Sequence, residues 1–162
     1  MIEIDPTARV SKLADIEDSV RGTRIRIGAF SIIDSFVKVK PAGGEGDVTI
    51  GQHTVINSGC VLYSGNGIVI GDHVSIAANC TFAPVNHEYR ARDRIIQAQG
   101  FAATKGGIVV EDDVWIGANV VVLDGATLRR GCVIAAGSIV RSEVDAYTIN
   151  AGNPLRIVGR RE

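Results

Sequence analysis

Large apolar residues recur every six positions along most of this chain, and this repeat constrains the fold more than any other feature. Extra residues interrupt the spacing only after a multiple of three repeats, so eighteen residues form a closed unit. Such a unit predicts three flat faces per turn of chain and a stack of triangular coils. The eighteen large positions are Ile4, Val10, Ile16, Ile27, Ile33, Val39, Ile50, Ile56, Leu62, Ile70, Ile76, Phe82, Val110, Ile116, Val122, Leu128, Ile134 and Val140.

Small residues occupy a second column, four positions after each large one. Fifteen of these eighteen positions hold Ala, Val, Ser, Thr or Cys, Val20 among them. The exceptions are Gly43, Asn66 and Asn86, and each ends a unit that an insertion follows. Because alternate residues of a strand face opposite sides, both columns are expected to fill the interior of the coils. Glycine directly after a large residue, as at Gly28 and Gly117, suits a tight turn.

The three cysteines, Cys60, Cys80 and Cys132, all fall in the small inward column. An odd number without a CxxC pair indicates neither a disulfide framework nor a zinc knuckle, so we expect core filler and, by default, a reducing cytoplasm. Nothing at the start resembles a targeting segment, and no apolar run approaches the ~18 residues that cross a bilayer. With 17 basic against 18 acidic residues, charge favours neither nucleic acid nor a membrane surface.

Five positions after each large residue the side chain should point outward, yet several of these residues are apolar. An outer apolar stripe is typical of a protein or ligand interface, although scattered valines on exposed strands are the alternative. The stripe comprises Ile32, Val55, Val61, Trp115, Val121, Val133 and Ile139. The sequence thus predicts one all-β domain over residues 1–162, with about six coils, an extruded loop over 83–109 and a C-terminal tail over 145–162.

The segment from Val110 to Arg161 contains the motifs VWIGANVVV, AAGSIV and AGNPLRIV. In these it resembles the hexapeptide-repeat acetyltransferases, especially the small O-acetyltransferases that act on galactosides, maltose and bacterial surface polysaccharides. The N-terminal coils match only as generic repeats. The resemblance implies a left-handed parallel β-helix, a homotrimer, acetyl-CoA as donor and active sites between neighbouring subunits. Spacing could not supply the handedness, since ordinary parallel crossovers are right-handed.

The long interruption carries the strongest candidate for chemistry. Pro84 opens it and Gly106 and Gly107 end it, as expected of an extruded loop, and long structureless loops are often lids or binding loops. Relatives carry a catalytic histidine here, and His87 is the only histidine in this stretch. Acetyl transfer to a hydroxyl needs a base, and histidine titrates in the required range. Glu88, Asp93 and Glu111 all remain open as the carboxylate that orients it.

The resemblance also assigns residues to the other parts of such a site. It places the backbone N–H of Ala118 at the oxyanion, although a plain turn would look the same, and Asn57 at the acceptor, although asparagine is common in turns. Coenzyme A is expected at Trp115, Gly117, Ala136, Ser138, Arg141, Pro154, Arg156 and Arg160. Three residues depart from the family pattern: Ser142 where lysine is frequent, and Glu111 and Arg129 where glycine is usual.

The leading prediction is an acetyl-CoA-dependent O-acetyltransferase that modifies a sugar or polysaccharide precursor without a metal. His53 and His73, one coil apart, should stack on one outer corner, which raises the alternative of a γ-class carbonic anhydrase that binds metal through histidines between subunits. The close-spaced HxxxxH pair of that class is absent. A non-catalytic β-helix scaffold is the third possibility, and it would account for the apolar stripe without a donor.

Overall fold

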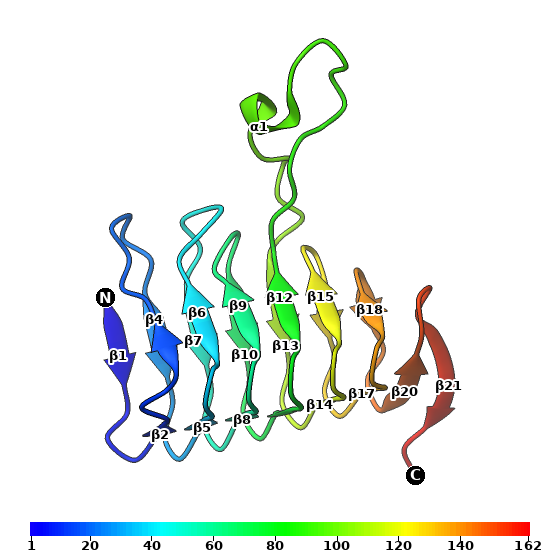
Figure 1. Ribbon diagram of the computed structural model, residues 1–162. Coiled ribbons are helices and arrows are strands. Elements are labelled where there is room, and N and C mark those ends of the chain that lie inside the picture. The colour runs from blue at the N-terminus through cyan, green and yellow to red at the C-terminus, as the bar shows by residue number, and fades with distance from the viewer.

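The computed structural model describes all 162 residues and shows three-strand coils stacked side by side into a parallel β-helix (Figure 1). Six complete coils are followed by a partial seventh, so the prediction of about six triangular coils is confirmed. Each coil contributes one strand to each of three sheets, which we name A, B and C. Every pairing between coils is parallel, and only the last strand, β21, runs antiparallel to its neighbour β20.

Short strands separated by turns make up the three sheets. Sheet A contains β1 (Ile2–Ile4), β4 (Ile25–Ile27), β7 (Val48–Ile50), β10 (Ile68–Ile70), β13 (Ile108–Val110), β16 (Thr127–Leu128) and β19 (Glu143–Val144). Sheet B contains β2 (Arg9–Val10), β5 (Ile32–Ile33), β8 (Val55–Ile56), β11 (Ser75–Ile76), β14 (Trp115–Ile116), β17 (Val133–Ile134), β20 (Thr148–Ala151) and β21 (Arg156–Arg160). Sheet C contains β3 (Asp15–Ile16), β6 (Lys38–Lys40), β9 (Val61–Tyr63), β12 (Thr81–Ala83), β15 (Val121–Leu123) and β18 (Ile139–Val140).

The large residues of the repeat form the core. Fifteen of the eighteen are buried, and the three others, Ile4, Val10 and Ile16, belong to the first coil, which has a neighbouring coil on one side only. All three cysteines are buried with free thiols, as predicted. The thiol of Cys80 donates to the carbonyl of Gly117 in the next coil, so the inward column also joins coils.

One inward prediction is wrong. Val20 is fully exposed, and the inward place at that corner is taken by Ile25, on the far side of the insertion. The other three insertions behave in the same way: Val48, Ile68 and Ile108 are buried where Gly43, Asn66 and Asn86 broke the pattern. The reason is strand alternation, because the residue two places before the first large residue of a coil faces the same side as that residue.

Glycines after the large residues do not serve positive-φ turns. A Cβ on Gly117 would lie 2.6 Å from the backbone nitrogen of Ala136, so glycine is required there by the close approach of the next coil. The left-handed conformation falls two residues later, at positions such as His53, His73 and Asn119. The expectation of a tight turn was correct for the corner, but the residue that needs left-handed φ is a different one.

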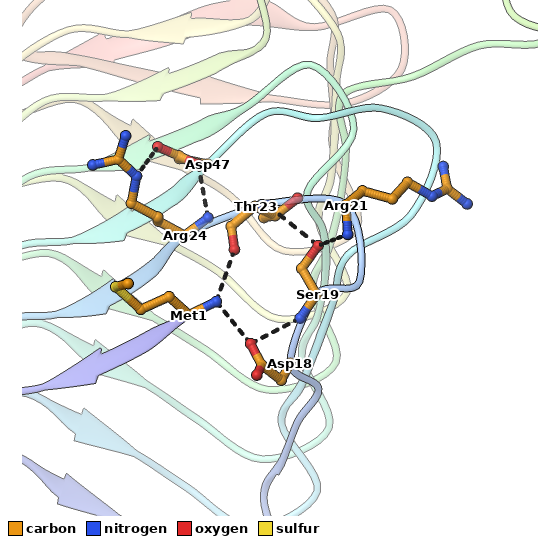
Figure 2. Close-up of polar contacts among 7 residues, drawn as sticks. All are labelled: Met1, Asp18, Ser19, Arg21, Thr23, Arg24 and Asp47. Atoms are coloured by element: carbon orange, nitrogen blue, oxygen red, sulfur yellow. Dashed lines mark hydrogen bonds and ion pairs between the residues drawn. The ribbon is translucent and has the colours of Figure 1, made fainter.

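The first insertion, between β3 and β4, is held by polar contacts rather than by apolar packing (Figure 2). The Met1 amino group donates to the Asp18 carboxylate at 2.7 Å and to the Thr23 carbonyl at 3.2 Å. The Ser19 hydroxyl accepts from the backbone N–H of Arg21 and of Thr23. These bonds close the corner of the first coil without covering its interior.

The long loop occupies residues 84–107 and leaves the corner between sheets C and A, where Figure 1 shows it extending well beyond the row of coils. It is shorter than the predicted 83–109, because Ala83 ends β12 and Ile108 begins β13. It contains the only helix, α1 (Ile96–Gln99), whose four residues are far too few to cross a membrane. Within the expected tail over 145–162, β20 and β21 extend sheet B.

The apolar stripe exists as two rows on neighbouring sheets. Register across sheet B aligns Ile32, Val55, Trp115 and Val133, with Ser75 between them. A second row on sheet C contains Val61, Val121 and Ile139. These side chains are half-buried within the chain, except Trp115, which is 57% exposed.

Candidate functional site

His87 lies at the neck of the long loop, where the two arms form a short antiparallel ribbon. The Glu88 N–H donates to the Gly100 carbonyl at 3.0 Å, and the Ala102 N–H donates to the Asn86 carbonyl at 2.8 Å. Between these bonds His87 bridges to Phe101, with ring centroids 5.1 Å apart. The imidazole is exposed and forms no hydrogen bond within the chain, so both ring nitrogens are available to a ligand.

A cavity of about 280 Å³ opens beside His87 at the corner between sheets C and A. Lys105 from the returning arm, Asp124 from the turn after β15 and Arg141 from the end of β18 line it together with His87. Sequence reasoning did not single out Lys105 or Asp124. Asp124 could have been noticed, because it places a carboxylate two residues after a buried Val122, in a corner turn.

No carboxylate contacts the His87 ring. The backbone N–H groups of Arg90 and Tyr89 donate to Glu88 and hold the pKa of its carboxyl below the ordinary value. Glu111 is engaged by Arg129 and by the Arg130 N–H. Two of the three carboxylates left open by the sequence are therefore directed at other groups.

A second set of predicted residues gathers at the corner between sheets B and C. Asn57, Gly117, Ala118 and Ala136 lie there in the third, fifth and sixth coils, after β8, β14 and β17. The Ala118 N–H has no acceptor in the chain, which suits a donor to a developing oxyanion, but the Ala136 N–H at the same turn position is also free. The Asn57 side-chain amide donates to the Ile76 carbonyl at 2.8 Å, so it stabilises its own corner.

Trp115 stands on sheet B next to this corner, at the edge of a shallow hollow. His73, Asp113, Val133 and Arg161 line the hollow with it. The Arg161 guanidinium donates to Asp113 at 2.8 Å and lies over the Tyr147 ring, so it lies beside Trp115 but outside the hollow that Arg141, Pro154 and Arg156 line.

The arginines predicted to bind coenzyme A lie in two places. Arg141, Pro154 and Arg156 line one hollow of about 410 Å³, where Arg141 donates to the Asn153 side chain at 3.1 Å and has no carboxylate partner. Arg160 lies outside this hollow, on exposed β21. Ser138 is buried, with its hydroxyl donating to the Ala135 carbonyl and accepting from the Gly152 N–H, so only its backbone could meet a ligand.

The predicted residues are therefore not assembled within one chain. His87 belongs to the corner between sheets C and A, whereas Ala118 and Asn57 belong to the corner between B and C. The loop that carries His87 extends away from its own coils (Figure 1).

His53 and His73 stack as expected, with ring centroids 4.9 Å apart and planes 2° from parallel, and Phe30 continues the stack. Rings in this arrangement present their nitrogens in separate parallel planes, which does not suit shared coordination of one ion. No group of three or more His, Cys, Asp or Glu side chains converges within the chain.

Known proteins match both the repeat and the whole fold. Residues 107–142 match the family model described as bacterial transferase hexapeptide (six repeats). The galactoside O-acetyltransferase of Escherichia coli K12 is 31% identical over 69% of this chain, and a Mycobacterium tuberculosis protein named as a probable acetyltransferase is 32% identical over 73% of it. The chain spans only 53% and 39% of the lengths of these two relatives.

Solved structures extend the match. The N-acyltransferase AntD of Bacillus cereus, in complex with dTDP and coenzyme A, has a TM-score of 0.83 over 99% of this chain and 84% of its own, at 23% identity. It shows that the coils form a left-handed β-helix, as predicted. A hexapeptide-repeat-containing acetyltransferase of Vibrio cholerae, complexed with acetyl coenzyme A, is 35% identical over 84% of this chain and 71% of its own, with a TM-score of 0.73. The chain therefore belongs to the hexapeptide-repeat acetyltransferase family.

Proposed function

We propose that this protein is an acetyl-CoA-dependent O-acetyltransferase that modifies a hydroxyl of a sugar or polysaccharide precursor, with His87 as general base. The observation that carries the proposal is the exposed imidazole of His87, held in a defined ribbon beside a cavity and free of internal hydrogen bonds. A general base must reach the proton that it removes. The His87 ring makes no hydrogen bond within the chain, so none has to break before the ring accepts a proton.

The active site is proposed to form between chains of a homotrimer. The His87 loop of one chain reaches the corner of its neighbour that carries Ala118, because neither group can meet the other within a single chain. Half-buried apolar rows on sheets B and C supply surfaces for such contacts. We place the protein in the cytoplasm, which agrees with its three free thiols.

The residues present fit coenzyme A. Arg141 and Arg156, without carboxylate partners, would hold its phosphates next to Pro154, and the free backbone N–H groups at Ala118 and Ala136 would face its thioester end. Acetyl-CoA supplies an activated acetyl group. His87 accepts the proton of the acceptor hydroxyl as the oxygen attacks the thioester carbonyl carbon, and Ala118 N–H stabilises the oxyanion. The C–S bond then breaks, and the imidazolium returns the proton to the thiolate.

The acceptor is proposed to bear a hydroxyl, whereas AntD is an N-acyltransferase whose structures contain a dTDP-linked amino sugar. Thiol release from acetyl-CoA should therefore be measured against sugars, nucleotide sugars, amino sugars, serine and chloramphenicol. Preference for an amine over every hydroxyl would overturn the O-transfer assignment and leave acetyl transfer intact.

The base is tested by His87→Ala in the same assay. We expect turnover to fall by roughly 10²- to 10⁴-fold, the usual contribution of a well-placed general base. His53→Ala is the matched control, because His53 sits in the ring stack on another corner and should keep wild-type turnover. If His87→Ala retained most of the activity, His87 would have no part in proton transfer.

A further inference from the structure

We propose that Asp124 is the carboxylate that positions His87, and that it acts through the base of the loop rather than by touching the imidazole. The inference rests on the proposed role of His87. Asp124 lies in the turn between β15 and β16, on the same corner as the loop and one coil beyond it. Its side chain is only 2% exposed.

The Asp124 carboxylate gathers three donors from two other segments. Its Oδ2 accepts from the Lys105 N–H at 2.8 Å and from the Asn66 side-chain amide at 3.3 Å. Its Oδ1 accepts from the Gly107 N–H at 2.9 Å. Asn66 comes from the insertion between β9 and β10, so one carboxylate joins two insertions and its own corner.

A buried carboxylate is costly unless donors surround it. Two of the three donors on Asp124 are backbone groups of the returning arm, so the carboxylate is satisfied only when this arm is in place. No cationic side chain pairs with it, which leaves the arm as its main source of compensation. Displacement of residues 105–107 would leave the buried Asp124 carboxylate without two of its hydrogen-bond donors. The free-energy cost of this loss holds the returning arm against the coils.

The returning arm transmits this position to His87. Five residues before Gly107, the Ala102 N–H donates to the Asn86 carbonyl, and Phe101 packs against the His87 ring. The outgoing arm has its own tie, since the Pro84 carbonyl accepts from the Asn66 N–H at 3.0 Å. The outgoing arm is therefore tied to Asn66 and the returning arm to Asp124, and Asn66 donates to Asp124.

At the equivalent turns on this corner, no other coil has a buried carboxylate in the position of Asp124. Two residues after the large residue they carry Asp18, Pro41, Ser64, Pro84, Asp124 and Ser142. Asp18 is the other carboxylate, and its side chain is 70% exposed. A buried charge is present only in the coil that follows the loop.

Asp124→Asn tests the proposal, because it keeps the shape and replaces one accepting oxygen with an NH₂ group that faces other donors. Displacement of a reacting group by about 1 Å can cost about 10²-fold. We therefore expect kcat to fall by about 10- to 100-fold while KM for acetyl-CoA changes by less than about twofold. The His87 imidazole NMR signal, assigned with His87→Ala among only three histidines, should shift or broaden while those of His53 and His73 stay fixed.

Asp72→Asn is the matched control. The Asp72 carboxylate also accepts a backbone N–H, from Gln52 at 2.7 Å, but at the corner between sheets A and B. Asp72→Asn should leave both kcat and the His87 NMR signal unchanged. An unchanged His87 signal in Asp124→Asn, or an equal loss of kcat in Asp72→Asn, would overturn the proposal. If the wild-type chain showed no acetyl transfer at all, the proposed function would fail, while the NMR signal would still decide whether Asp124 positions the ring.

Discussion

Each thiol of this protein lies beside a large apolar residue in the interior of the coils, where only a small side chain fits. Burial raises the pKa of the Cys132 thiol to about 12, so at pH 8 its reactive thiolate is essentially absent. Cys60 and Cys80 are equally buried, and each donates to a carbonyl of the next coil.

We expect none of the three thiols to react with an aromatic disulfide reagent at pH 8 in the folded protein. All three should react within seconds to minutes once denaturant exposes them. The measurement is absorbance of the released thiolate with and without guanidinium. Rapid reaction of one equivalent in the folded state would show that a cysteine is accessible and not core filler.

The backbone donor at Ala118 can be tested without a change of charge. Asn119 has φ of 58°, and Ala118 precedes it as the first central residue of the turn, a position at which proline is favoured, so Ala118→Pro is the substitution designed to remove the N–H. Ala118→Pro should lower kcat by roughly 10²- to 10³-fold, as expected for one oxyanion donor. Ala78→Pro, at the same turn position one coil earlier, is the control, and an equal loss there would show that the proline acts by distorting the stack.

At the scale of the strands, the repeat predicted the coils, the core and the corner that carries the loop, because alternation and a closed unit of eighteen leave little freedom. It misplaced Val20, since periodicity cannot tell on which side of an insertion the last inward residue lies. It also missed Asp124, because the partners of that carboxylate, two backbone N–H groups and the Asn66 side-chain amide, are distant from it in sequence. The proposed site would also need a second chain, which the sequence of one chain cannot place.

Glu111 and Arg129, which stand where the family usually has glycine, form ion pairs between coils. Arg129 bridges Glu111 in the preceding coil and Glu143 in the following one, both at 2.8 Å. Arg129 and the Arg130 N–H hold the pKa of the Glu111 carboxyl below its ordinary 4.5. The lower folded-state pKa means that this contact stabilises the protein above pH 4.5 and that the contribution is lost as pH falls through the folded-state value.

Glu111→Gln should therefore lower stability at pH 7 by about 0.5 kcal/mol, a modest value because the side chain is one-third exposed and screened by solvent. The difference from wild type should vanish below the folded-state pKa. Thermal unfolding of Glu111→Gln and wild type, at pH 7 and at a pH below the folded-state pKa of Glu111, measures the difference in stability. Glu45→Gln, at an exposed glutamate without a salt bridge, should change stability at neither pH. A difference that persisted in acid would assign the effect to packing.

At the scale of the assembly, the separation of His87 from Ala118 on different corners makes the proposed site a property of two chains. His87→Ala and Ala118→Pro damage opposite halves of that site. The two variants can be co-expressed so that they mix in trimers. A site is then intact where the His87 of an Ala118→Pro chain meets the Ala118 N–H of a neighbouring His87→Ala chain. Random mixing in equal amounts gives about one quarter of sites intact. Turnover should then rise well above that of either variant alone, towards about a quarter of wild type. A site built within one chain could not be restored in this way, so a mixture no more active than its parents would overturn the proposal that His87 of one chain and Ala118 of its neighbour share a site.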